Sequence, residues 1–217
     1  KLKTATNYAQ SHGMLQEDPF YDKKITFEEV EVPYLTLEEL QTIMEKNILN
    51  DRLRRVRDVF VFSCFTGLAY SDTYFLTEEH LHKANDGKIW IKKPRQKTKV
   101  VADIPLLEVP LQILEKYRGQ QTGGRLLPVC SNQKVNQYLK ELATVCGINK
   151  ELTYHVARYT FATSLTLLHD VPMASIAKML GHTNIRQTQH YAKATNILVG
   201  RSMQNLSEQL NLHMEVK

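Results

Sequence analysis

The segment DRLRRVRDVFVFSCFTG, residues 51–67, places the strongest constraint on the fold of this chain. Its first half is polar, whereas Val59 to Phe65 would be apolar on nearly every side of a helix. A helix that is apolar all round is stable only when other elements surround it. Gly67 is expected to end the helix, because glycine readily adopts the left-handed conformation that follows a last helical turn. The segment therefore predicts a central helix with other elements packed around it.

Residues 80–106 change to the two-residue period that is typical of β-strands. KIWIKK alternates between apolar and polar residues, and Asn85-Asp86-Gly87 before it is a strong turn signal. Pro94 interrupts the pattern, which resumes in KTKVVADIPL. These features predict a small antiparallel sheet of two or three strands.

Helical periodicity fills most of the remaining sequence. It is present in residues 109–119, 134–147, 153–169, 173–180, 184–194 and from about Asn196 to Leu212. The predicted fold class is therefore mostly α with one small antiparallel β-sheet (α+β).

The N-terminal part of the chain is predicted to be a separate piece. Pro33 forbids helix continuation, and Thr36 with Glu39 forms the capping-box pattern that begins a new helix. We place the domain boundary near residue 34, which gives residues 1–34 and 35–217. Because the chain begins KLKTATNYAQ, without methionine and as if within a helix, we expect it to be a fragment of a longer protein.

Composition narrows the class of protein. Hydrophobic residues make up 42% and charged residues 24% of the 217, as in ordinary soluble globular proteins. Three widely spaced cysteines without a C-x-x-C pair argue against a disulfide framework or a zinc site and favour a reducing, cytoplasmic compartment. No apolar run is long enough to predict a membrane-spanning helix.

Positive charge is concentrated in one segment. The net charge of the chain is +5, and residues 88–102 alone contain six basic side chains and no acid before Asp103. They are Lys88, Lys92, Lys93, Arg95, Lys97 and Lys99. Such a segment favours a polyanionic partner, although charge runs are often only solvated surface.

Two short stretches carry the candidate chemistry. His155 and Arg158 lie three residues apart, on one helical face with apolar neighbours. A buried arginine needs an anion, which can be a ligand or an internal carboxylate. Further on, Gly181 ends a helix, so His182 is expected directly after its C-terminal end. Tyr191 is expected about two turns into the helix that follows. The alternative for this second stretch is a DNA-reading helix-turn-helix with a core tyrosine.

Together these stretches resemble the C-terminal signature of the tyrosine recombinase (phage integrase) family. That signature is H-x-x-R, then L-G-H, then a nucleophilic tyrosine ten residues after the glycine; HVARYTFAT and LGHTNIRQTQHY match it. The family also has a lysine in a β-hairpin turn, and RQKTK supplies one. The matching residues are His155, Arg158, Gly181, His182, Tyr191 and Lys97. The resemblance runs from about Thr36 to Tyr191 and is closest to integrases of bacterial conjugative transposons.

The resemblance implies a metal-independent enzyme, without cofactors, that cleaves and rejoins DNA. Tyr191 would attack the phosphorus to give a 3′-phosphotyrosyl link, and Arg158 would brace the phosphate with its planar fork. Lys97 would be the general acid, and His155 and His182 would assist proton transfer.

The resemblance also implies partners. The chain would bind double-stranded DNA, as a monomer when free and as a homotetramer in the DNA synapse. Accessory DNA-bending or excision proteins would take part, and the compartment would be a bacterial cytoplasm. Residues 1–34 would be the end of a core-binding domain with its linker, and 35–217 a catalytic domain with a C-terminal tail helix. That helix is predicted to dock on a neighbouring protomer through Ile197, Leu198, Met203, Leu206 and Leu210. The expected DNA contacts are Lys92, Lys93, Arg95, Lys99, Arg54 and Arg55.

The sequence departs from the family in TGLAYSD, residues 66–72. Most members have an arginine after TGL, whereas this chain has Ala69. Loss of one such oxyanion donor typically costs about 100- to 1000-fold in rate. The enzyme is therefore impaired, or another arginine or a partner supplies the charge.

We expect Arg57 to replace the missing arginine. It lies on one helical stripe with apolar residues, where an arginine needs an anion. Twelve helical residues span about 18 Å, so a turn of the chain after Gly67 would have to close that gap. The alternative is an ion pair with Asp58 or Asp72. Weaker candidates are Arg54, Arg55 and Arg95.

Two rival functions stay open. One is a non-catalytic regulator that uses residues 172–194 as a helix-turn-helix. The other is a type IB topoisomerase, which shares the chemistry but lacks site-specificity.

Overall fold

The computed structural model describes residues 2–21, 33–191 and 195–210. The chain divides into two compact units, Lys1–Glu31 and Val32–Lys217. Within the first unit the described residues form one helix, α1 (Leu2–Ser11), which buries none of its side chains. Its assignment to a core-binding domain stays a prediction.

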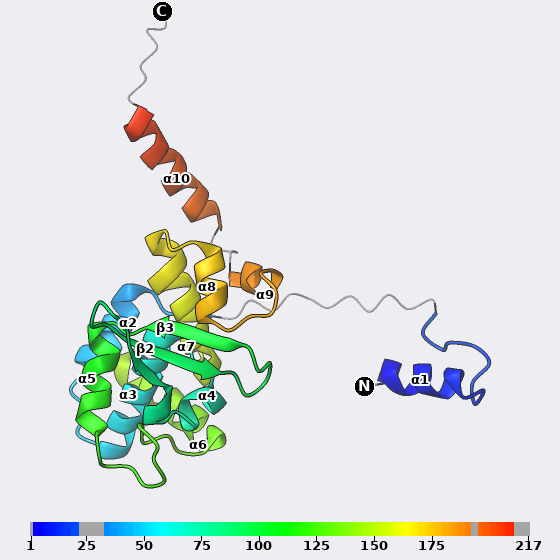
Figure 1. Ribbon diagram of the computed structural model, residues 1–217, viewed down its shortest axis with the longest axis horizontal. Helices are drawn as coiled ribbons and strands as arrows, with labels where there is room; N and C mark the ends of the chain where they lie inside the picture. The colour runs from blue at the N-terminus through cyan, green and yellow to red at the C-terminus, as the bar shows by residue number, and fades with distance from the viewer. Residues whose placement is uncertain (1, 22–32, 192–194, 211–217) are drawn as a thin grey trace, which may run out of the picture. The chain divides into compact units, whose positions relative to one another are not determined.

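The second unit combines helices with one small sheet (Figure 1). Its helices are α2 (Leu37–Glu45), α3 (Asp51–Thr66), α4 (Tyr70–Tyr74), α5 (Glu108–Tyr117), α6 (Asn132–Cys146), α7 (Tyr154–Thr160), α8 (Met173–Met179), α9 (Arg186–Gln189) and α10 (Thr195–Leu210). Its strands are β1 (Leu81–Lys83), β2 (Ile89–Pro94) and β3 (Val101–Pro105), and single 3₁₀ turns occupy Glu78–His80 and Leu167–His169. The predicted α+β class is confirmed.

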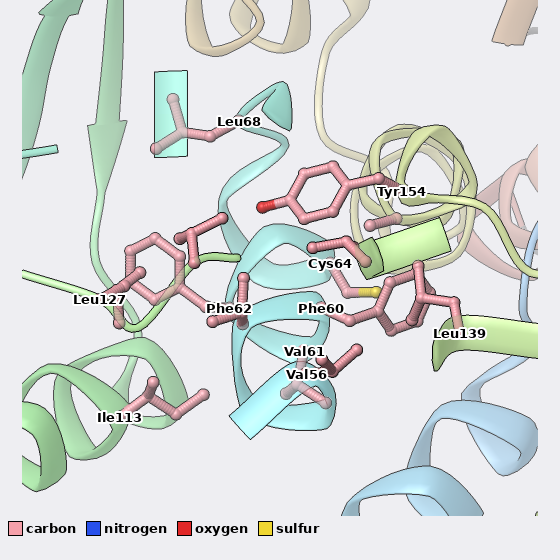
Figure 2. Packing of buried hydrophobic residues seen from close by; sticks show 14 of the residues in the cluster. Val56, Phe60, Val61, Phe62, Cys64, Leu68, Ile113, Leu127, Leu139 and Tyr154 are labelled. Carbon is pink, nitrogen blue, oxygen red and sulfur yellow. The ribbon is translucent and has the colours of Figure 1, made fainter. Parts of the chain in front are cut away.

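Helix α3 is the centre of the core, as its apolar sequence predicts. It packs against α2, α5, α6 and α7. Phe60 and Phe62 point to different sides of the helix, and both are fully buried (Figure 2). Asn50 caps the first turn with its side chain, and Gly67 ends the helix in the left-handed conformation with φ +67°. A Cβ at Gly67 would lie 2.5 Å from the Phe161 ring, so no larger residue fits there.

The three strands form an antiparallel sheet in the order β1-β2-β3. In the β2–β3 register Ile91 pairs with Ile104, and both side chains are buried. Helix α8 packs against β3, where Lys178 forms an ion pair with Asp103 at 3.1 Å. The β2–β3 hairpin carries the basic segment.

The helical segment after Thr153 is continuous but not uniform. Helix α7 passes into a π-helix at Phe161–Thr166. The Thr166 hydroxyl donates back to the carbonyls of Phe161 and Ala162 at 2.9 and 2.8 Å. This helical segment also binds the backbone of Leu35, near the start of the second unit. The Leu35 N–H donates to the Thr160 hydroxyl at 3.0 Å, and the Ser164 hydroxyl donates to the Leu35 carbonyl.

The helix predicted for residues 184–194 is much shorter in the structure. Helix α9 is a single turn, and Tyr191 follows its end rather than lying two turns inside it. Residues 192–194 lie outside the described residues. Among the helices that the structure describes, none is long and apolar enough to span a membrane.

Candidate active site

Arg158 is the buried centre of the candidate site, with 3% of its surface exposed. Its guanidinium donates to the carbonyls of Gly67 and Leu180, both at 2.6 Å. These two residues end helices α3 and α8, so the partial negative charges of two helix C-termini surround the cation. No carboxylate among the described residues forms an ion pair with Arg158. Burial lowers its pKa below the ordinary value of an arginine, an effect that the Tyr191 phenol partly opposes.

His182 connects Arg158 to the chain that carries the tyrosine. Its Nε2 lies 2.9 Å from the Arg158 guanidinium, and its Nδ1 lies 2.8 Å from the Thr188 hydroxyl. Because arginine can only donate, Nε2 must accept and Nδ1 must carry the proton. Burial and then the positive charges of Arg158 and Arg95 lower the His182 pKa to about 4. His182 is therefore a neutral imidazole at neutral pH.

Tyr191 lies against this pair, and only 7% of its surface is exposed. Its ring is parallel to the His182 ring, with centroids 6.1 Å apart. Its other ring contact is with Tyr159, edge-to-face at 4.7 Å. The phenol is also close enough to the Arg158 guanidinium to raise the pKa of that group.

His155 and Lys97 complete the predicted set. His155 is one turn before Arg158 on α7 and keeps an exposed edge. Its pKa is nevertheless lowered, first by partial exclusion of water and then by the charges of Arg158, Arg95 and Lys97. Lys97 is exposed in the β2–β3 turn, close enough to act on His155 through its charge. The five residues that the sequence assigned to catalysis by resemblance thus gather in one region.

Arg95, predicted only as a weaker candidate for the missing arginine, belongs to the same region. Its aliphatic stem packs on Gly181, where a Cβ would lie 2.6 Å from the Arg95 Cδ, and Gly181 has φ +58°. Its Nη1 lies 3.5 Å from the Gly181 carbonyl. Its Nε lies 3.5 Å from Oδ2 of buried Asp72, at an angle that makes no hydrogen bond within the described residues. The guanidinium therefore retains donors for an anion.

Asp72 fixes the hairpin that carries Arg95. The side chain is 2% exposed, and its Oδ1 accepts the Gln96 N–H at 2.8 Å. Alternation along β2 is the sequence signal that could have revealed this arrangement. Ile91, Lys93 and Arg95 share the inward parity, whereas Lys92 points outward.

A groove adjoins the position of the absent arginine. It has a volume of about 380 Å³ and is lined by Ala69, Asn136, Thr153, His155 and Arg158, among others. It is open to a longer side chain at position 69.

The prediction for Arg57 is corrected by the structure. Its Nε donates to Asp58 at 3.0 Å and its Nη1 to the Lys46 carbonyl at 3.0 Å. Arg158 touches Gly67 at the other end of α3, and ten helical residues span about 15 Å. The alternative ion pair with Asp58 is the one observed, and the turn after Gly67 does not bring Arg57 to the cluster.

One of the predicted DNA contacts is also corrected. Lys93 is only 3% exposed, donates to the Phe75 carbonyl at 2.8 Å and lies 2.9 Å from His80 Nε2. It faces the core because it shares the inward parity of Ile91, so it is not available to DNA. Of the remaining predicted contacts, Arg95 is half-buried. The other four are exposed, namely Lys92, Lys99, Arg54 and Arg55, and Arg54 is paired with Asp51.

Solved structures share this fold. A lambda integrase dimer bound to a COC′ core site matches with a TM-score of 0.68 at 17% identity, covering 88% of this chain and 69% of that one. The Tn1549 transposon integrase in complex with a circular intermediate DNA matches with a TM-score of 0.64 at 20% identity, covering 88% of this chain and 71% of that one. The fold is thus that of a tyrosine recombinase catalytic domain.

The family follows from the sequence. The model described as "Phage integrase family" matches residues 33–196, and the chain belongs to that family.

Curated relatives are similar at lower coverage. Tyrosine recombinase XerC of Rickettsia canadensis is 28% identical over 153 residues, which are 65% of this chain and 48% of that protein. Tyrosine recombinase XerD of Listeria monocytogenes is 25% identical over 213 residues, which are 90% of this chain and 70% of that protein. The chain spans about half the length of several relatives that it matches.

Proposed function

We propose that this chain is the catalytic part of a site-specific DNA recombinase. It cleaves and rejoins DNA strands through a 3′-phosphotyrosyl intermediate and serves integration and excision of a mobile element. The observation that carries the proposal is that buried Arg158 and buried Tyr191 meet at His182, whose Nε2 lies 2.9 Å from the guanidinium and whose ring is parallel to the Tyr191 ring. Similarity to the Tn1549 transposon integrase supports the mobile-element role.

The cleavage step can be assigned to these residues. The Tyr191 oxygen attacks phosphorus, the P–O5′ bond breaks, and Lys97 gives a proton to the departing 5′-oxygen. His155, neutral near pH 7 because its pKa is lowered, can accept the phenolic proton, whereas His182, whose Nε2 already accepts from Arg158, orients the guanidinium. Rejoining is the reverse reaction, with a 5′-hydroxyl as nucleophile. Arg158 binds the equatorial oxygens, where charge increases in the transition state.

In this proposal Arg95, rather than Arg57, supplies the second positive charge on the phosphate. Its Nε faces the Asp72 carboxylate at 3.5 Å, which holds the guanidinium beside the cluster, and its charge acts on both His155 and His182. Arg95 thus approaches Arg158 and the histidines from the hairpin. An arginine at position 69 would approach the same residues from the start of α4.

The wider assembly follows from the proposed reaction. The partner is double-stranded DNA, contacted by exposed lysines of the hairpin. Strand exchange takes place in a homotetramer on DNA, formed from a free monomer, and accessory DNA-bending or excision proteins set its direction.

A helix-turn-helix regulator is a weaker candidate, because α9 is a single turn and offers little recognition surface. A type IB topoisomerase shares the chemistry. Cleavage at one site rather than at many distinguishes the recombinase from it.

The test is covalent trapping on a nicked suicide substrate that contains the element's crossover site. We expect a protein–DNA adduct on a denaturing gel that is absent for Tyr191→Phe, which still binds the site. A folded, DNA-binding parent chain that forms no adduct would refute the proposed catalytic function. An adduct that persists in Tyr191→Phe would refute the nucleophile.

A further inference from the structure

Tyr159 is the aromatic residue that connects the two halves of the site. It follows Arg158 directly on α7 and is half-buried. Its ring lies edge-to-face with His155 at 5.1 Å and with Tyr191 at 4.7 Å between centroids. Among the residues that the structure describes, no other ring contacts both.

Tyr191 depends on such contacts for its position. Helix α9 ends at Gln189 and Tyr191 follows in a 3₁₀ stretch, which holds the chain less firmly than an α-helix does. Its ring is packed between His182, parallel at 6.1 Å, and Tyr159, which is the nearer of the two. Edge-to-face packing is a favoured arrangement of aromatic rings, and it fixes orientation as well as distance.

We propose that Tyr159 is a positioning residue for the nucleophile, resting on the proposed function of this site. Arg158 and Tyr159 are consecutive on α7, so the group that binds the phosphate and the ring that touches the nucleophile share one helical turn. Attack requires the oxygen to lie about 3–3.5 Å from phosphorus with the correct alignment. The Tyr159 ring sets that approach through its edge-to-face contact with the Tyr191 ring.

The experiment compares Tyr159→Phe, which keeps the ring, with Tyr159→Leu, which removes it. Three quantities are measured for each: the single-turnover rate of adduct formation at saturating suicide substrate, the Kd for the site, and the thermal unfolding midpoint. We expect Tyr159→Leu to form adduct about ten- to a hundred-fold more slowly, as for a small misplacement of reacting groups. Tyr159→Phe should restore a rate close to that of the parent, and the Kd of both variants should be unchanged.

A parent rate for folded Tyr159→Leu, or an equally slow Tyr159→Phe, would overturn the proposal. A rate loss matched by an equal loss of DNA affinity would also overturn it, because the ring would then serve binding. If Tyr159→Leu does not fold, Tyr159→Gln is judged by the same criteria. Failure of the proposed function is distinct, because the parent chain itself would then form no Tyr191 adduct, and Tyr159 would have no nucleophile to position.

Discussion

At the scale of single residues, Arg95 is proposed to supply the positive charge that an arginine in place of Ala69 would supply. Arg95 reaches the cluster from the β2–β3 hairpin, and a groove is open beside Ala69. We expect Arg95→Ala to slow adduct formation about 100- to 1000-fold, the usual effect of losing one oxyanion donor. Adding Ala69→Arg to that variant should recover part of the rate, because the new guanidinium can occupy the groove next to Arg158. Single-turnover kinetics on the suicide substrate measure both effects.

Arg57→Ala is the matched control for Arg95→Ala. It removes an arginine that donates to Asp58 and to the carbonyls of Met44 and Lys46 at the end of α2. Folded Arg57→Ala should keep the parent rate per molecule. A slow Arg57→Ala together with an unaffected Arg95→Ala would contradict the assignment.

His182 gives the fold a defined dependence on pH. Its folded pKa of about 4 is below the ordinary 6.5, so between these values the unfolded chain binds the proton more readily. The stability contributed by neutral His182 is therefore complete above about pH 6.5 and is lost as the pH falls toward 4. It amounts to on the order of 1 kcal/mol, since the imidazole is partly exposed.

The measurement is the urea unfolding free energy of the parent and of His182→Gln between pH 7 and 4. The parent should lose more stability than the variant over this range. His190→Gln, which changes an exposed histidine, should follow the parent. Equal slopes for the parent and His182→Gln would show that the imidazole is protonated at no cost.

How much of the site could be predicted depends on sequence distance. His155, Arg158, His182 and Tyr191 stand in two short motifs, so the residues themselves reveal their grouping. Arg95 could not be assigned in this way, because its partners Asp72 and Gly181 are far from it in sequence and meet it only in the fold. Lys93 was misassigned because positive charge was counted without the strand alternation that turns it inward.

At the scale of elements, Asp58 ties α3 to its neighbours. It is buried and accepts from Arg57, from Lys116 at 2.6 Å and from the Tyr117 hydroxyl at 2.8 Å. The last two residues belong to α5, so one carboxylate holds two helices together. We expect Asp58→Ala to lower the unfolding free energy by about 3 kcal/mol, because cationic and hydroxyl donors lose their partner.

Denaturant unfolding measures this loss. The exposed pair of Glu115 with Arg118 provides the control, and Glu115→Ala should cost less than about 1 kcal/mol. A similar small cost for Asp58→Ala would mean that the buried network contributes nothing to stability.

The helices with strong local signals were predictable, and the irregular ones were not. Thr36 with Glu39 predicts where α2 begins, and Gly67 predicts where α3 ends. The structure confirms both. The short α9 and the π-helix after α7 have no comparable capping or terminating signal in the sequence.

At the scale of the whole molecule, α10 presents an unpaired apolar stripe. Val199, Met203, Leu206 and Leu210 are spaced by four, three and four residues, and all are exposed. Ile197 and Leu198 were predicted to join this contact, but their side chains lie outside the described residues. The docking of this helix on a neighbouring protomer remains a proposal.

We expect deletion of residues 202–217, or Met203→Gln with Leu206→Gln, to abolish higher-order assembly on DNA. Binding of one protomer to one half-site should be unchanged, because the stripe does not belong to the candidate site. Gel mobility on half-site and full-site DNA separates the two effects. Unchanged assembly in both variants would exclude the docking role.

The π-helix at Phe161–Thr166 has a consequence for chain length. Such a turn contains one residue more than a regular α turn, and here it lies between Arg158 and the stretch that leads to His182. Deleting one residue here would let the helix close with regular α turns, and the segments on either side would keep about the same facing, because a π turn takes up its extra residue within one turn. The same deletion in the regular part of α7 would instead rotate everything after it by about 100° and separate the phosphate-binding arginine from the histidine. A one-residue difference in length between the two motifs is therefore tolerated at this turn and not before it.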